Sequence, residues 1–124
     1  MIIGIGTDII EIKRIAASLE RQGDAFWERI LAPEERREIK SAKRRLEYLA
    51  GRFAAKEAAS KALGTGIGEV GLHDLVIWNN ERGAPQMYLQ GGAAKVAEQL
   101  GVRKIHVSIS HSEHYATATV VAEG

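Results

Sequence analysis

The chain has 124 residues, with 17 lysines and arginines against 16 aspartates and glutamates, and it has no cysteine. This length predicts a single domain over residues 1–124, and the missing cysteine excludes disulfides, thiolate metal sites and a cysteine nucleophile. No apolar run approaches the ~18 residues of a membrane span and no secretory signal opens the sequence, so we expect a cytoplasmic protein without a membrane partner.

The first part of the chain predicts a strand followed by two helices. Residues 1–5 are typical of a short buried strand, and Gly4 and Gly6 would let another backbone approach closely. Apolar residues then recur at helical spacing over residues 11–22. Asp24 is expected to cap a short second helix.

The longest helix is predicted over residues 43–63, with Gly64 ending it. Pro33 and the two glutamates after it are expected to open a separate helix upstream. Glu57 and Lys61 fall on or beside the apolar face of the long helix, so Glu57 is a carboxylate set among alanines.

The second half of the chain predicts mostly strands, and the segregated strands and helices indicate an α+β fold in which the long helix packs on a mostly antiparallel sheet. The expected elements are a loop over 64–68, hairpin strands over 75–78 and 86–90, a helix over 93–100, and strands over 104–110 and 115–122.

Asp8 and Glu57 are the candidate metal ligands. A partly buried carboxylate needs a partner, and two carboxylates without cysteine or close histidine pairs indicate a hard cation such as Mg²⁺, completed by waters and substrate phosphates. Simpler interpretations stay open: Asp8 could cap the first helix, and Glu57 could form a surface ion pair with Lys61, four residues later.

Basic residues gather over residues 36–45, which favours phosphates or an acidic partner, although a solvated helix face would have the same composition. Few aromatic residues accompany them, so nucleic-acid binding has little support. The glycines of residues 64–68 could hold a phosphate through their backbone amides, or only end the long helix. His106, His111 and His114 are typical of polar strand and turn residues.

Three segments together resemble the holo-acyl-carrier-protein synthases, the small group of 4′-phosphopantetheinyl transferases. The start, GIGTDIIEIKRI over residues 4–15, is similar to the opening of that family. The segment RFAAKEAASKALGTG over residues 52–66 is similar to the helix signature F-x-x-K-E-A-x-x-K-A with its G-T-G. HVSISH over 106–111 and YATA over 115–118 are similar to the closing strands.

The resemblance implies transfer of the 4′-phosphopantetheine arm of coenzyme A to a serine of apo-acyl carrier protein, with release of adenosine 3′,5′-bisphosphate, in the service of fatty acid biosynthesis. It implies that Asp8 and Glu57 hold Mg²⁺ and that Lys61 reaches a phosphate oxygen. Implied coenzyme A residues are Arg52, His111, Lys43, Arg44, Arg45, Gly64, Thr65, Gly66 and Pro85. Implied carrier-protein residues are Lys13, Arg14 and Arg21.

Such a transfer needs charge neutralisation and in-line placement more than covalent help. The serine proton must leave, and either Glu57 or a metal-bound water is the candidate base. A different class also stays open, a nonenzymatic phosphate- or RNA-binding module that uses residues 36–45, and metal dependence would separate the two.

The family's usual assembly is a homotrimer, and one feature of the sequence agrees with it. The last strand, residues 115–122, has no charge on either face, whereas antiparallel strands usually expose a polar face to water. A neighbouring chain would cover the second face, and His111, just before that strand, could then serve the neighbour's Glu57. The alternative is a monomer whose own long helix covers the strand.

Overall fold

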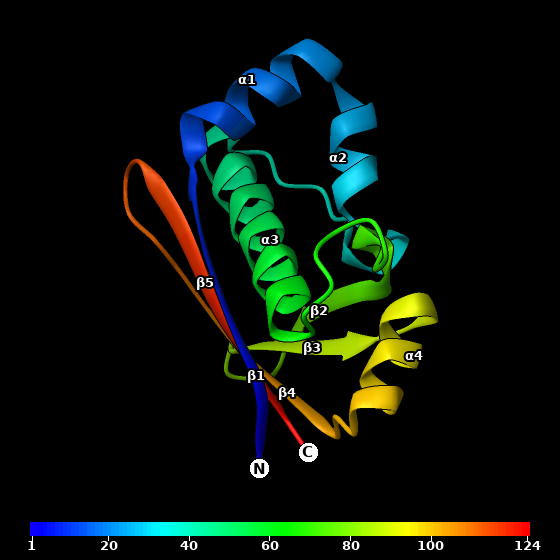
Figure 1. The fold of residues 1–124 in the computed structure, drawn as a ribbon. Helices are drawn as coiled ribbons and strands as arrows, with labels where there is room; N and C mark the ends of the chain where they lie inside the picture. Colours follow the sequence, from blue (N-terminus) through cyan, green and yellow to red (C-terminus); the bar gives the residue numbers. More distant parts are fainter.

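The computed structural model describes all of residues 1–124. Figure 1 shows its elements, which follow one another as β1 (Ile2–Glu11), α1 (Ile12–Gln22), α2 (Asp24–Ile30), α3 (Ala42–Ala62), β2 (Leu75–Asn79), β3 (Pro85–Leu89), α4 (Gly91–Leu100), β4 (Lys104–His111) and β5 (Tyr115–Glu123). Two short 3₁₀ turns, Pro33–Glu35 and Leu72–Asp74, precede α3 and β2.

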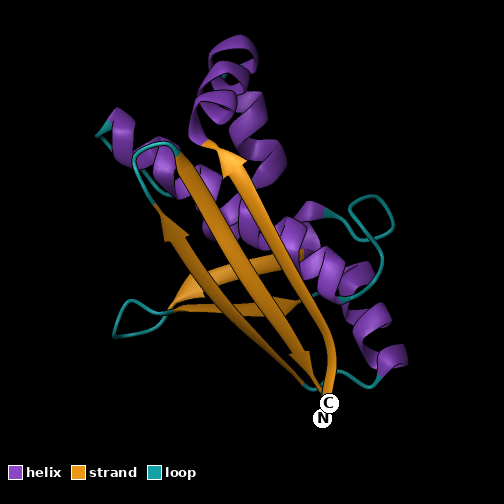
Figure 2. Ribbon diagram, turned by 60° about the vertical axis from the view of Figure 1, so that its left-hand side comes forward, coloured by secondary structure: helices purple, strands orange, loops and turns teal.

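The strands form two antiparallel sheets, and Figure 2 shows the helices gathered to one side of the larger one. The larger sheet has three strands in the order β1-β5-β4, and the smaller one is the β2-β3 hairpin. Helix α3 packs against all three strands of the larger sheet. The expected α+β class and the helix-on-sheet packing are therefore confirmed.

The register of the larger sheet decides which side chains meet α3. Asp8 is paired with Ala118 and Ile9 with Thr117, so Asp8 shares the inner, helix-covered face with the buried alanine. The neighbouring residues Ile5 and Ile9 point to the outer face, where they are 64% and 67% exposed. One face of the sheet is thus packed, and the other is open within a single chain.

Gly4 and Gly6 let β1 lie directly against α3. A Cβ atom at Gly4 would lie 1.9 Å from the carbonyl oxygen of Ala62, and one at Gly6 would lie 1.8 Å from that of Ala58. The close approach expected from the glycine pair is confirmed, and the neighbouring backbone is the long helix.

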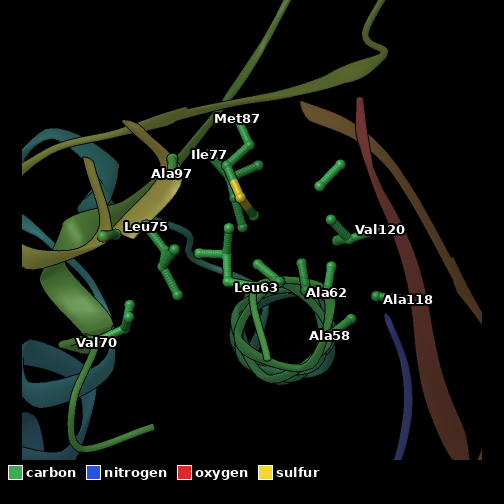
Figure 3. Packing of buried hydrophobic residues seen from close by; sticks show 14 of the residues in the cluster. Ala58, Ala62, Leu63, Val70, Leu75, Ile77, Met87, Ala97, Ala118 and Val120 are labelled. Atoms are coloured by element: carbon green, nitrogen blue, oxygen red, sulfur yellow. The ribbon is translucent and has the colours of Figure 1, made fainter. Parts of the chain in front are cut away.

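The main core lies where α3 faces the larger sheet and the hairpin. Figure 3 shows Ala58 and Ala62 of α3 turned toward Ala118 and Val120 of β5, with larger side chains, among them Met87, filling the space toward the hairpin. Small side chains on both surfaces bring helix and sheet close together. A second cluster, which includes Trp27 and Leu49, packs α1 and α2 on the other half of α3.

Three local expectations need correction. The first strand continues to Glu11, and only Gly6 in it is fully buried, because the outer face of the strand has no cover within the chain. Asp24 lies inside the first turn of α2, and the capping position is occupied by Gly23, which has no side chain to bind the free amides. Pro33 opens only a 3₁₀ turn, after which the chain is irregular until Ser41 caps α3 through the backbone amide of Arg44, at 3.2 Å.

Lys56 lies in the middle of α3, and although lysine is usually exposed its side chain is completely buried. Its Nζ atom donates to the carboxylate of Glu35 and, at 2.8 Å each, to the carbonyl oxygens of Ile30 and Leu72. The Glu35 carboxylate also accepts from the backbone amides of Ala32 and Ile77. This ion pair joins α3 to the end of α2 and to both 3₁₀ turns.

Candidate active site

The two candidate metal ligands lie close enough for their charges to interact, although 49 positions of sequence separate them. Asp8 comes from the inner face of β1 and Glu57 from the adjacent part of α3. Lys61 donates to the Asp8 carboxylate at 3.2 Å and to the carbonyl oxygen of Thr7 at 2.9 Å. Asp8 is therefore not a helix cap, and Lys61 pairs with Asp8 rather than with Glu57.

The charges of this group influence one another. Partial burial is the largest cause that raises the pKa of Glu57, the negative charge of Asp8 raises it further, and Lys61 opposes both. The two carboxylates repel each other, and Lys61 balances only one of their negative charges, so an added cation would stabilise the site.

The residues present fit Mg²⁺. No cluster of three or more histidine, aspartate, cysteine or glutamate side chains exists in the structure, so a metal cage made only of protein is absent. Mg²⁺ is commonly held by one or two carboxylates, with waters and substrate phosphates as its other ligands. Asp8 and Glu57 supply that donor set, and the Asp8 side chain is 19% exposed, which leaves an oxygen within reach of a ligand.

A second, basic part of the site lies on another side of α3. A cavity of about 330 Å³ is lined by Arg44, Arg52 and His111, three of the residues expected to hold coenzyme A, together with Glu47, Tyr48, Gly51 and Ile109. His111, at the end of β4, faces the Glu47 carboxylate with 3.4 Å between Nδ1 and Oε2. The structure thus brings together an imidazole and two guanidinium groups that are far apart in the sequence.

Arg52 is the most buried charged residue of this basic cavity, at 7% exposure. Its guanidinium donates to the side-chain oxygen of Asn79 at the end of β2, and it lies 4.4 Å from the centre of the Tyr48 ring. Its Nε atom has no hydrogen-bond partner. Burial lowers the pKa of Arg52, although a guanidinium stays charged at neutral pH.

Two neighbours of Arg44 do not join it in the cavity. The guanidinium of Arg45 lies 4.5 Å from the centre of the Trp27 ring and 3.4 Å from the Asp24 carboxylate, because successive helical residues point about 100° apart. Arg45 therefore secures α2 against α3 within this chain. Lys43 is exposed and does not line the cavity.

Three backbone amides of the loop after α3 are already paired within the chain. The backbone amides of Thr65 and Gly66 donate to the carbonyl oxygen of Ser60, and that of Gly64 donates to Lys61. The loop therefore closes the helix, as the capping interpretation expected. Pro85 lies elsewhere, paired with Asn79 in the hairpin, and so stands beside the partner of Arg52.

The basic residues expected to bind a carrier protein, Lys13, Arg14 and Arg21, are all exposed on α1. Arg14 lines a groove of about 540 Å³ whose other walls include Ile9, Phe53 and Tyr115. Ile9 follows Asp8, and Phe53 is one helical turn before Glu57, so this largely apolar groove extends from α1 toward the carboxylate pair.

The carboxylate pair and the basic cavity lie on different sides of α3. Asp8 belongs to one edge strand of the larger sheet and His111 to the opposite edge strand, both on the face that α3 covers. Along α3, Arg52 and Glu57 point about 140° apart. The long helix therefore stands between the two halves of the expected site.

Sequence reasoning missed three residues that line or support the basic cavity, namely Tyr48, Glu47 and Asn79. Tyr48 precedes Arg52 by four residues, a spacing that puts side chains together on a helix and could have indicated the stack. Asn79 lies in a distant hairpin, so no local pattern links it to Arg52.

Fold and site together define a small α+β protein that holds a carboxylate pair and a basic cavity suited to phosphate groups. The family model of the 4′-phosphopantetheinyl transferase superfamily matches residues 4–120. The chain therefore belongs to that superfamily.

Individual relatives within the superfamily match over almost the whole chain. A holo-[acyl-carrier-protein] synthase of Vibrio parahaemolyticus is 51% identical over 98% of both chains. The crystal structure of the Neisseria meningitidis synthase matches with a TM-score of 0.91 at 43% identity, over 100% of both chains. The Helicobacter pylori synthase in complex with coenzyme A matches with a TM-score of 0.82 at 37% identity, over 96% of this chain and 99% of that one.

Proposed function

We propose that the protein transfers the 4′-phosphopantetheine arm of coenzyme A to a serine of apo-acyl carrier protein, with Mg²⁺ as its metal. The observation that carries the proposal is the carboxylate pair, because Asp8 and Glu57 meet across β1 and α3 with Lys61 beside them. The names of its relatives supply the substrates, since three solved relatives are described as complexes with coenzyme A or a part of it. The family resemblance extends the proposal to fatty acid biosynthesis in the cytoplasm.

In the proposed reaction the serine oxygen attacks the phosphorus that bears pantetheine. The bond from that phosphorus to the adenosine-side phosphate breaks, and adenosine 3′,5′-bisphosphate leaves. Mg²⁺, held by Asp8 and Glu57, would neutralise the charge of the diphosphate oxygens. Lys61 lies at 3.2 Å from Asp8 and is 52% exposed, so its ammonium can donate to a phosphate oxygen there. Glu57, with its raised pKa, is this chain's candidate to accept the serine proton.

The carrier protein is proposed to dock on α1. Lys13, Arg14 and Arg21 give this helix a basic surface suited to an acidic partner. The groove beside Arg14 extends toward Asp8 and Glu57, which would guide the carrier's serine toward the diphosphate.

The direct test incubates the protein with coenzyme A, Mg²⁺ and apo-acyl carrier protein, and then measures the intact mass of the carrier. We expect a gain of one phosphopantetheine group, lost on chelation of Mg²⁺ and in Asp8→Asn. A chain that binds coenzyme A but never changes the mass of the carrier, at any Mg²⁺ concentration, would be a binding module and not a transferase.

We propose further that each complete site forms between two copies of the chain, in a homotrimer. Two observations support this. The carboxylate pair and the basic cavity are separated by α3, so one coenzyme A cannot readily contact both within a chain. The outer face of the larger sheet exposes Ile5, Ile9 and Tyr115, and along β5 only Glu123, at the end of the strand, carries a charge. A contact between different surfaces of two copies closes into a ring when it is repeated.

Mixing inactive chains tests the shared site. Glu57→Gln damages one half and His111→Ala damages the other, so dissociating and reassembling the two together should restore some sites with both halves intact. The matched control mixes Glu57→Gln with Asp8→Asn, which damage the same half and should restore nothing. Light scattering should give the mass of three chains, and a monomer would refute the assembly.

A further inference from the structure

Tyr48 holds two arginines beside the basic cavity. The guanidinium carbon of Arg37 lies 4.2 Å from the centre of the Tyr48 ring, and that of Arg52 lies 4.4 Å from it. Both distances are within the range in which a cation is attracted to an aromatic face. The two arginines come from different places, because Arg52 belongs to α3 and Arg37 to the irregular segment before it.

The Tyr48 ring is fixed at its other end. Its hydroxyl donates to the backbone carbonyl oxygen of Glu35, whose carboxylate is held by the buried ammonium of Lys56. A side chain anchored in this way offers a rigid platform, so the positions of the two guanidinium groups are set before any ligand arrives.

The positive charges of these arginines are only partly balanced by carboxylates of the chain itself. Arg37 and Arg52 carry like charges against one ring, and Arg52 is buried with its Nε atom unpaired. A buried donor without an acceptor costs free energy, more so when the group is charged. The cavity of about 330 Å³ beside Arg52 is also lined by Arg44 and His111, so two guanidinium groups and an imidazole line a space in which Glu47 is the one carboxylate.

We propose that Arg37 and Arg52, positioned by the ring of Tyr48, clamp one phosphate group of coenzyme A. Arg37 is then a further substrate-binding residue and Tyr48 a positioning residue. Guanidinium groups bind phosphate through paired hydrogen bonds, which suits two arginines in fixed positions. The inference rests on the proposed function, because coenzyme A is taken as the ligand.

The first test compares Arg37→Gln with Lys40→Gln. Both variants remove one positive charge from the segment between the Pro33–Glu35 turn and α3, but Lys40 is exposed and makes no ion pair. Calorimetry measures the affinity of each variant and of the wild type for coenzyme A and for dephospho-coenzyme A, which lacks the 3′-phosphate. We expect Arg37→Gln to weaken coenzyme A binding about tenfold or more, as loss of a charged hydrogen bond does, with little change in Lys40→Gln.

The two ligands identify the clamped phosphate. A loss confined to coenzyme A assigns the clamp to the 3′-phosphate, and an equal loss for both ligands assigns it to the diphosphate. Equal affinities in Arg37→Gln and Lys40→Gln would overturn the proposal, because the loss of one positive charge would then account for the change in affinity by itself. A wild type that fails to bind coenzyme A would instead refute the proposed function.

The second test asks whether the ring itself acts. Tyr48→Phe keeps the ring and Tyr48→Leu removes it, while both lose the hydroxyl contact to Glu35. In folded protein we expect Tyr48→Leu to raise the KM for coenzyme A without raising the KM for carrier protein, and Tyr48→Phe, which keeps the ring but loses its anchor, to give a KM between those of Tyr48→Leu and the wild type. A KM for coenzyme A in Tyr48→Leu equal to that of the wild type would remove Tyr48 from its positioning role.

Discussion

Replacing Lys56 by methionine should destabilise the fold more than any exposed lysine change. Methionine keeps most of the side-chain volume but removes the ammonium that serves Glu35, Ile30 and Leu72. The Glu35 carboxylate would stay buried without its counterion, with two backbone amides as its remaining donors. Breaking one partner of a buried pair costs about 3–5 kcal/mol, a large part of the ~5–15 kcal/mol that stabilises a typical domain.

Urea and thermal unfolding at pH 7 measure this cost. For a chain of this length about 3–5 kcal/mol corresponds to a fall in Tm of roughly 10–20 °C. Lys95→Met, on the exposed side of α4, is the matched control and should change stability by less than ~0.5 kcal/mol. Adding Glu35→Gln to Lys56→Met should recover part of the loss, because the unpaired charge disappears. A Lys56→Met protein within ~1 kcal/mol of the wild type would refute the reasoning.

Three further predictions follow from the site and its supports. Glu57→Gln should lose transfer in the presence of Mg²⁺, and without metal it should match or exceed the wild type in unfolding stability at pH 7. The raised pKa of Glu57 means that the folded chain binds its proton more tightly than the unfolded chain, so wild-type stability falls as pH rises above 4.5, and urea unfolding against pH should lose that slope in the variant. Gly6→Ala should cost about 1–3 kcal/mol or prevent folding, because its methyl group would meet the Ala58 carbonyl; Gly71→Ala, whose methyl would lie 3.4 Å from the nearest atom, should cost less in the same assay. Arg14→Glu should raise the KM for carrier protein and leave coenzyme A affinity unchanged, and the wild-type KM for carrier should rise with salt; equal carrier KM values at low salt would contradict this.

Local patterns predicted most of the elements. Helical spacing and a closing glycine placed α3 within one residue at each end, and Gly101 closed α4 as expected, in the left-handed conformation. Alternation placed β4 and β5 with similar accuracy. These elements are set by side-chain periodicity and by chain breakers, which are properties of neighbouring residues.

Long-range contacts were harder to predict. Nothing within a few residues of Lys56 indicates that Glu35 lies beside it, so its charge predicted exposure, whereas the structure buries it completely. For the same reason Arg45 was grouped with Arg44, although packing of α2 draws it to Trp27. A charged side chain is therefore predicted correctly as exposed only if no residue distant in the sequence forms an ion pair with it in the fold.

The opening segment shows why the fold and the candidate chemistry depend on the same residues. Asp8 has a short side chain, so it reaches Lys61 only if β1 lies very close to α3. Gly6, two residues earlier on the same face of the strand, provides that closeness, because any Cβ atom there would collide with the carbonyl of Ala58. Ala58 directly follows Glu57 in the helix, so the contact that fixes the distance between strand and helix also fixes the distance between the two carboxylates. Replacing Gly6 would therefore disturb the two candidate metal ligands as well as the core.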